Sequence, residues 1–453
     1  MKKILLTMMG MLLILSLAAC GSTTDDGGTA DGGDEDTTYE TREFKKDATI
    51  GETVIYDENG VKITATELTY HNSSAEVKLL IENNTTEDLT FISGSMGYSC
   101  NAVNGYMISD GYLNCDVTAG NKAEETVSFG YDDIMAYGIF EIADIQIGFD
   151  ISGDSNKDVY TGPCSIVTSA AEGYDYEKLY YRESIASKEA QAQFGYSVPY
   201  FSDEAVYESN GLTIASQAVL TNNEDVTMLL LEVVNDTEQT VYTATTNIDV
   251  NGLRVYSSTW SYDTVNPGNT AIVAVALESV FEPEFFETYG IGEIGKIGRT
   301  MSFRDGDGKE FAEPANVTVE IPGADASLDK DGTEVYSAND VRIIAKGAYD
   351  DPSEYSDEMH ILLLVENTSD QTVELRDVED SLSVNGYMAD YSLGTIAVES
   401  GICSMIDIVL WGSGLDDIHV SEASEVKTVE FGLTIRDANG GTIDEPTIKF
   451  DVK

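Results

Sequence analysis

The sequence predicts an all-β protein of three tandem antiparallel β-sandwiches, and an internal repeat carries most of that prediction. Three stretches open alike, each placing a Tyr three residues before an Asn that starts a turn, at 54–63, 205–214 and 334–343. A period of more than about 100 residues indicates whole domains, because solenoid repeats are roughly 20–50 residues long. The chain therefore reads as a row of similar domains.

The first half of each repeat contains a core strand and a hairpin. An apolar run predicts the strand, at 77–81, 228–234 and 361–365, and it ends in a turn that begins at Asn83, Asn235 or Asn367. An Asn-Gly pair follows, at 104–105, 251–252 and 385–386. Both residues of such a pair tolerate the positive φ of a type I′ turn, so each pair predicts a hairpin.

The second half of each repeat begins with a strand that follows Gly120, Gly268 or Gly401. A short helix-like segment comes next, and a last hairpin turns at 152–158, 305–309 and 437–441. We count about seven or eight short strands per repeat, separated by turn signals, which is typical of an antiparallel β-sandwich with Greek-key connections.

This order of strand, Asn turn, Asn-Gly hairpin, Gly-led strand and Asp/Gly hairpin resembles the telokin-like, immunoglobulin-type domains of unknown function in Gram-positive lipoproteins. The resemblance covers 54–168, 205–321 and 334–453. It implies three immunoglobulin-like sandwiches and supplies no catalytic residues. The Cys…Trp…Cys pattern of antibody domains is absent from the sequence.

The expected domain boundaries follow from the repeats. Three immunoglobulin-like domains are predicted at 51–169, 204–322 and 334–453. The insertion at 170–203 is predicted to be a helical linker, with one helix over 176–194. The segment 323–333 is short, polar and rich in Gly and Asp, so it is predicted to be a plain hinge.

The first twenty residues predict a membrane anchor. Lys2 and Lys3 precede an apolar run over 4–19, which is shorter than the roughly 20 residues of a membrane span. The stretch Leu17-Ala18-Ala19-Cys20 resembles the lipobox of bacterial lipoproteins, which implies removal of 1–19 and acylation of Cys20. An ordinary secreted protein with a chance Cys is the alternative. Residues 20–50 are acidic and rich in Gly and Thr, and they are predicted to form a flexible tether.

The strongly negative charge of the chain limits the classes of partner that can be expected. The formal net charge is −56, and loss of Lys2 and Lys3 with the leader would make it more negative still. Phosphate backbones and anionic lipid headgroups repel such a chain, so nucleic acid is not expected as a partner.

Four cysteines remain after Cys20: Cys100, Cys115, Cys164 and Cys403. They are expected to be free thiols, and a disulfide between the first two is the alternative.

The sequence contains little that indicates catalysis. The three histidines lie at unrelated points of the first and third repeats, and neither a nucleophile elbow nor a phosphate-binding loop is present. We therefore predict no enzyme activity, no cofactor and no metal ligand. The stretch 305–308 resembles the start of a calcium loop but lacks the bidentate Glu, so a hairpin turn is the preferred interpretation.

These observations predict a lipid-anchored protein on the extracytoplasmic face of the cell membrane, acting as a non-catalytic binding or structural surface module with a protein or glycan ligand. An accessory carbohydrate-binding or cell-wall-binding protein is the alternative, and an enzyme is third. A ligand platform would consist of Tyr256, Trp260 and Tyr262, which share one face of a predicted strand. The other interpretation of these aromatic side chains is that they belong to the core.

The anchor can be tested at one residue. Replacing Cys20 with Ala removes the thiol that the acyl chains require, so we expect the variant to leave the membrane fraction and to lose labelling by a fatty-acid analogue. An acylated Cys20→Ala variant would contradict the lipobox interpretation.

Overall fold

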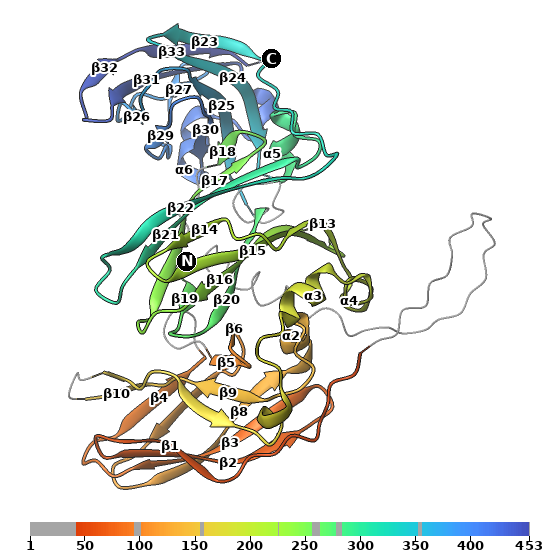
Figure 1. Cartoon of the computed structure of the whole chain (residues 1–453). Coiled ribbons are helices and arrows are strands. Elements are labelled where there is room, and N and C mark those ends of the chain that lie inside the picture. Colours follow the sequence, from red (N-terminus) through yellow and green to blue (C-terminus); the bar gives the residue numbers. More distant parts are fainter. Residues whose placement is uncertain are drawn as a thin grey trace, which may run out of the picture. The chain divides into compact units, whose positions relative to one another are not determined.

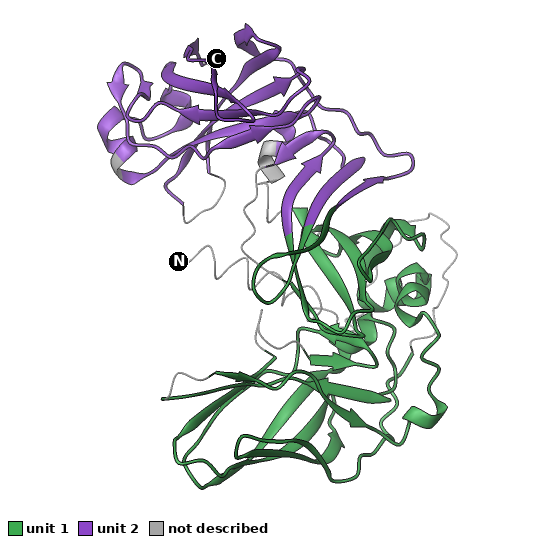
Figure 2. Cartoon of the chain, turned by 60° about the vertical axis from the view of Figure 1, so that its left-hand side comes forward, with its two compact units in different colours: residues 1–244, 260–279, 302–314 green, residues 245–259, 280–301, 315–453 purple. Residues whose placement is uncertain are grey.

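The computed structural model describes residues 42–452, except 95–100, 155–157, 225, 256–262, 278–282 and 352–355. With 53% strand and 9% helix, it confirms the all-β fold class (Figure 1). The chain forms two compact units (Figure 2), residues 1–244, 260–279 and 302–314, and residues 245–259, 280–301 and 315–453. Because this division falls within the second repeat, the three-domain boundaries stay a prediction.

The first repeat is a sandwich inside the first unit. One sheet has the order β1 (Thr53–Glu58), β2 (Val61–Tyr70), β3 (Ser74–Asn83), β8 (Lys122–Gly130). A second has the order β11 (Val159–Tyr160), β10 (Asp150–Gly153), β4 (Leu89–Ser93), β7 (Leu113–Val117). Alternate residues of these strands, such as Val77, Leu79 and Phe91, form one buried core, as the period-two pattern requires.

A nine-stranded sheet joins the first repeat to the second within this unit. Its order is β12 (Cys164–Val167), β9 (Asp144–Ile147), β5 (Asn101–Val103), β6 (Tyr106–Ile108), β20 (Thr270–Ala276), β16 (Thr227–Asn235), β15 (Leu212–Asn222), β13 (Tyr196–Ser202), and β14 (Tyr207–Ser209) also pairs with β15. The sheet is antiparallel except where β6 meets β20. That parallel contact is the join.

The second unit contains the corresponding join between the second and third repeats. One nine-stranded sheet has the order β22 (Glu310–Glu320), β21 (Lys296–Arg304), β17 (Val241–Val250), β18 (Leu253–Val255), β30 (Cys403–Leu410), β25 (Met359–Asn367), β24 (Val341–Asp350), β23 (Thr333–Ala338), with β19 (Asp263–Val265) on β17. Again one pair is parallel, β18 with β30.

The third repeat is completed by a seven-stranded sheet. Its order is β28 (Tyr387–Met388), β27 (Ser383–Val384), β31 (Thr428–Asp437), β26 (Val373–Asp377), β29 (Ile396–Val398), and β32 (Thr442–Asp444) and β33 (Thr447–Asp451) also pair with β31. Leu363, Ile408 and Phe431 lie in the core between this sheet and β24, β25 and β30.

The helices are short, and their bounds are α2 (Tyr131–Ala136), α3 (Tyr180–Ala186), α4 (Lys188–Phe194), α5 (Pro283–Thr288), α6 (Gly412–Ile418), with 3₁₀ turns η1 (Ala171–Gly173) and η3 (Ala423–Glu425). In the described part of the chain, no helix combines the length and apolar character that a membrane crossing requires. After α2, α5 and α6 the chain passes through a left-handed residue, at Gly138, Gly290 and His419.

The single helix predicted over 176–194 is wrong. The segment forms α3 and α4, which are separated at Ser187, where ψ is 127° and the side chain accepts a hydrogen bond from the amide of Ala190. Ser187 thus ends one helix and caps the next, as Ser does at helix N-termini. The predicted linker also extends into β13, which pairs with β15 and belongs to the sheet of the second repeat.

Two segments predicted to be flexible are packed in place. Phe44 packs in the core of the first repeat and Ala48 is buried, so the prediction of a flexible tether over 20–50 is wrong for 44–48. In the predicted hinge, the amide of Asp329 donates to the carbonyl of Tyr289 at 2.7 Å, and Lys346 Nζ donates to the Asp329 carbonyl at 2.8 Å. Both predictions failed for the same reason. Each segment is held by a few isolated contacts, and such contacts produce no periodic pattern in the sequence.

One buried asparagine recurs at the end of the core strand of each repeat. The side chain of Asn367 donates to the carbonyls of Gln371 at 2.9 Å and Val398 at 2.8 Å, and its Oδ1 accepts from the amide and hydroxyl of Ser369 at 3.0 and 2.7 Å. Asn83 and Asn235 make the same four bonds with their own neighbours. The predicted Asn turns are therefore confirmed. The same asparagine side chains are also buried in the core, where they bond to a carbonyl of another strand.

Replacing Asn367 with Ala should lower the free energy of unfolding of the third repeat by roughly 2–4 kcal/mol, because the carbonyl of Val398 stays buried without its donor. Asn439→Ala is the matched control, since Asn439 is exposed in a turn and its loss should cost no more than about 0.5 kcal/mol. Denaturant titration followed by circular dichroism measures both. Equal effects of the two substitutions would contradict the structural role of Asn367.

Candidate functional site

The Asn-Gly hairpins form in all three repeats with the predicted turn geometry. The φ angles are 50° and 83° at Asn104 and Gly105, 51° and 82° at 251–252, and 53° and 85° at 385–386. Positive φ at two successive residues is the signature of a type I′ turn. The strands that leave these turns are β6, β18 and β28.

The asparagine of each pair also fixes the direction of the hairpin. Asn104 Oδ1 accepts from the amides of Ala143 and Asp144 at 2.7 and 3.1 Å, and its Nδ2 donates to the carbonyl of Glu141 at 2.8 Å. The same three bonds recur at Asn251 and Asn385. Each hairpin therefore leaves its sheet at a position set by the repeat itself.

In the first repeat this hairpin is bonded to the second repeat. Tyr106 pairs with Thr270, whose amide donates to the carbonyl of Gly105 at 2.9 Å. The next residue, Met107, is buried, and the amide of Asn266 lies 3.1 Å from its sulfur. The hairpin thus adds a strand to the edge of a neighbouring sheet, which is β-augmentation within one chain.

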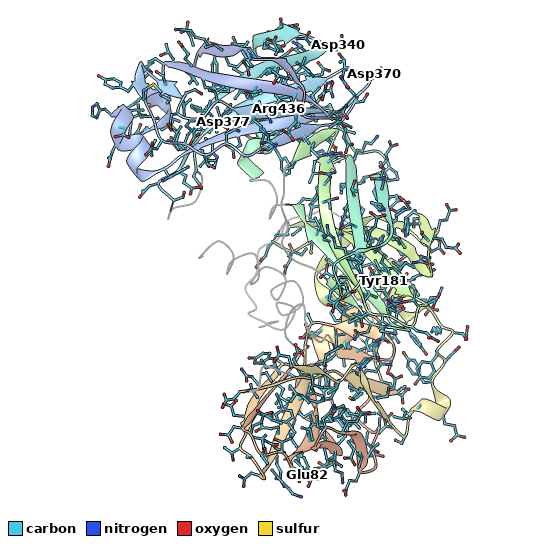
Figure 3. The ribbon with its side chains drawn as sticks, turned by 90° about the vertical axis from the view of Figure 1, so that its left-hand side faces the viewer. Glu82, Tyr181, Asp340, Asp370, Asp377 and Arg436 are labelled. Carbon is cyan, nitrogen blue, oxygen red and sulfur yellow. The ribbon has the colours of Figure 1, made fainter. Side chains whose placement is uncertain are left out.

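Aromatic side chains cover this join. The rings of Tyr106, Tyr137 and Tyr181 lie with centroids 6.1–6.4 Å apart. Tyr181, which is labelled in Figure 3, belongs to α3. Such distances suit tilted aromatic pairs, which stabilise beyond the area that they bury. Burial raises the pKa of Tyr106 and Tyr181, so both phenols are neutral. Ile272 and Ala274 of β20 pack against the same cluster.

The second hairpin is bonded to the third repeat in the same way. Leu253 pairs with Cys403, and Arg254 pairs with Ser404, in parallel register. The guanidinium of Arg254 forms ion pairs with Asp249 and, at 3.2 Å, with Glu399. Tyr289, buried next to the join, donates to the carbonyl of Leu363 at 3.2 Å. Both joins combine main-chain pairing with buried side chains.

The third hairpin ends differently. β28 is the first strand of its sheet and pairs only with β27 among the strands that the structure describes. Tyr387 is 50% exposed and Met388 is 56% exposed. The ring of His419 packs edge-on against Tyr387, with centroids 5.3 Å apart. The stretch Asn-Gly-Tyr-Met occurs both here, at 385–388, and in the first repeat, at 104–107, where its Met is buried.

The strands at equivalent positions of the three repeats, of which β20 and β30 receive a hairpin and β8 does not, differ in their outward face. Register aligns Lys122 of β8 with Thr270 of β20 and Cys403 of β30. Two residues further on, β8 has the exposed Glu124, whereas β20 has Ile272, which is packed against the aromatic cluster. β8 is the last strand of its sheet in the described order. Charged side chains on an edge strand oppose pairing, so β8 is a protected edge.

The predicted ligand platform is not available for comparison, since Tyr256, Trp260 and Tyr262 lie outside the described residues, as do Cys20 and Cys100. Cys115, Cys164 and Cys403 are free thiols, and burial raises the pKa of each of them. A bridge from Cys115 is therefore not formed in this structure.

The stretch at 305–308 forms a hairpin turn. The Asp305 side chain accepts hydrogen bonds from the amides of Asp307 and Lys309, both at 2.9 Å. Asp437 accepts in the same way from the amides of Asn439 and Gly441, at 2.8 and 2.9 Å. The carboxylate of each turn is thus used by its own backbone, as in an Asx turn.

Sequence reasoning placed a candidate aromatic platform at Tyr256, Trp260 and Tyr262 but missed the exposed hairpin of the third repeat. The repeated tetrapeptide Asn-Gly-Tyr-Met was the available signal. It could not show which copy is covered, because the covering strand β20 begins more than 150 residues after Tyr106.

No family model matches the sequence, and no curated protein matches it. Among solved structures, the chain is similar to a 1.5-MDa bacterial ice-binding adhesin (10% identity, TM-score 0.14, covering 84% of this chain and 90% of that one). It is similar to the Amycolatopsis orientalis exo-chitosanase CsxA (8%, 0.16, 89% and 78%) and to a protein of Corynebacterium diphtheriae described as membrane anchored (10%, 0.13, 90% and 96%). TM-scores this low carry no argument about function.

The two copies of the tetrapeptide allow a matched comparison. Tyr106→Ala should destabilise the first unit by roughly 2–3 kcal/mol, less than the cost of removing a fully buried aromatic ring. It should also speed hydrogen exchange at the amide of Thr270. Tyr387→Ala should change stability by no more than about 0.5 kcal/mol, because its ring is half exposed. If Tyr106→Ala leaves the stability of the first unit unchanged, the aromatic cluster does not stabilise the join.

Proposed function

We propose that the chain is a membrane-anchored, extracytoplasmic and non-catalytic binding module, and that its third repeat binds a partner protein through the edge of β28. The partner adds one of its own strands beside Tyr387 and Met388. Main-chain hydrogen bonds supply affinity in this mode, and the alternate side chains supply specificity.

The proposal rests on a difference in strand pairing among three equivalent hairpins. β6 and β18 each pair in parallel with a strand of the following repeat. β28 leaves the same kind of turn, held by the same asparagine bonds, and is an edge with two exposed apolar side chains. An exposed edge with apolar side chains is a template for pairing with another chain.

The two internal joins also define the chemistry of the partner. A receiving strand presents open main-chain groups and an outward face that is mostly apolar, such as Ile272 and Ala274 in β20. The β8 edge of a second copy does not fit, because it carries Lys122 and Glu124 on that face. The net charge of −56 also opposes self-association. We therefore expect the partner to be a different β-sheet protein with an apolar edge.

The anchored position supports this role. Acylation at Cys20 would hold the protein on the extracytoplasmic face of the membrane, because two acyl chains suffice for stable attachment. A binding edge in the third repeat would then be accessible to partners outside the cell. The carbohydrate-binding alternative depends on Tyr256, Trp260 and Tyr262, which lie outside the described residues.

Hydrogen exchange on the full chain tests whether the third edge is open. The amides of Tyr106 and Met107 should exchange slowly, because their hairpin lies inside a sheet. The amides of Tyr387 and Met388, in the same tetrapeptide, should exchange at least about ten times faster, since edge amides open at low free-energy cost. Equal protection of the two copies would contradict an open edge at β28.

A graft tests whether the hairpin can dock. Giving β8 the outward residues of β20, by Lys122→Thr, Glu124→Ile and Thr126→Ala, supplies an apolar edge on a second copy. The grafted full chain should form concentration-dependent dimers in sedimentation velocity, and adding Tyr387→Glu and Met388→Glu should abolish them. A monomeric graft, or dimers that survive the two Glu substitutions, would contradict docking. Dimers of the wild-type chain that depend on Tyr387 would make a second copy the partner.

A further inference from the structure

Side chains that can bind a metal ion gather at one end of the β24–β25 pair. Tyr349 pairs with His360 and Asp350 pairs with Met359, and the amide of Asp351 donates to the carbonyl of Glu358 at 3.0 Å. Because side chains two apart in a strand share a face, this register puts Asp351, Glu358 and His360 on the same face. One ligand atom from each of the three lies within 4.8 Å of the others.

A fourth residue orients the histidine. The Nδ1 atom of His360 lies 2.9 and 3.1 Å from the two carboxylate oxygens of Asp407 on the neighbouring strand β30. An ionised carboxylate accepts hydrogen bonds, so Nδ1 carries the proton, and Nε2 faces Asp351 at 3.7 Å. Histidines that bind metal ions commonly donate their other ring N–H to a carboxylate in this way.

We propose that Asp351, Glu358 and His360 bind a divalent transition-metal cation, Zn²⁺ in the first place, with Asp407 as a positioning residue. His360 is buried, and three carboxylates surround one imidazole, so a cation offsets their mutual repulsion. The site belongs to the third repeat alone, since the equivalent strand positions of the other repeats do not combine one histidine with these carboxylates.

The donor set selects the class of ion. Calcium takes six to eight oxygen ligands, whereas zinc accepts imidazole nitrogen together with carboxylate oxygen and often keeps one position for water. Two ligands about 2.0–2.2 Å from one ion lie at most about 4.4 Å apart. The carboxylates therefore need to move by only a small amount to close around the ion, that of Glu358 from a partly exposed position and that of Asp351 from a buried one.

A metal-free arrangement is the competing explanation. Burial lowers the pKa of His360, but the hydrogen bond and charge of Asp407, together with Asp351, outweigh that effect and raise it above its usual value. An imidazolium held between two carboxylates would then be a purely structural ion pair. Metal binding separates the two explanations.

The experiment uses the full chain after treatment with a chelator. Titration calorimetry with Zn²⁺ should give one site with a dissociation constant of about 10⁻⁶ M or tighter, and Co²⁺ should produce visible absorption bands of a low-coordinate site. His360→Gln and Glu358→Gln should each abolish or greatly weaken the site, and Asp407→Asn should weaken binding by about 10–100-fold. His71→Gln is the control, because His71 forms an exposed pair with Glu76 at 3.0 Å and should leave binding unchanged.

Circular dichroism of each variant shows whether it is folded. Glu358→Gln keeps the result informative if His360→Gln does not fold, since Glu358 lies at the partly exposed rim. Absence of a one-to-one site in the wild-type chain would overturn the proposal in favour of the ion pair. Binding that persists in both Gln variants would place the ion elsewhere and overturn it too.

Discussion

The buried asparagine at the end of each core strand is the constraint on which the rest of the structure depends. An Asn side chain offers two donors and one acceptor oxygen, so a single residue can hold three segments together. The main chain of the same residue continues this role, because the carbonyls of Asn235 and Asn367 accept from the amides of Gly268 and Gly401 at 2.8 Å. Two residues after each glycine, Thr270 and Cys403 begin the strands that receive a hairpin.

The joins between repeats therefore depend on two asparagines that act in different repeats. One sets where the receiving strand begins, and the other, in the Asn-Gly pair, sets where the hairpin points. Main-chain pairing itself is nearly independent of sequence, so the outward side chains decide which edges are used. Ile272 of β20 packs against the aromatic cluster at the join, whereas Glu124 at the equivalent position of β8 is exposed. The proposed function follows from the same distinction.

The sequence predicted what is local. The Asn-Gly turns, the Asn turns and the Asp hairpins were predictable because their residues determine φ or cap the backbone within a few positions. The joins were not, since Tyr106 and Thr270 approach only after both repeats have folded. The helix break at Ser187 was missed because apolar residues on both sides fit one helical period. The His360 cluster has no motif spacing, and Asp407 reaches it only through the register of β25 and β30.

Comparison of the three repeats at the residue after the helix shows what a join requires. A Cβ atom added at Gly138 would lie 2.3 Å from the carbonyl oxygen of Tyr180, and one at Gly290 would lie 2.5 Å from Cβ of Asp329. Glycine at both positions thus leaves room for the chain that crosses to the next repeat, besides taking the positive φ at low cost.

The third repeat has His419 at this position, with a φ angle of 56°. The residue before it is the core residue Ile418, whereas Tyr137 and Tyr289 precede the glycines of the first two repeats and pack at the joins. The third repeat therefore differs from the first two at both positions, and the imidazole of His419 packs on Tyr387. The Asn-Gly hairpin is nevertheless present in the third repeat, with the same tetrapeptide Asn-Gly-Tyr-Met as in the first repeat. Since Tyr387 and Met388 contribute little to the core of their own repeat, stability within this repeat does not account for them. The proposed pairing of a partner strand with β28 would account for them.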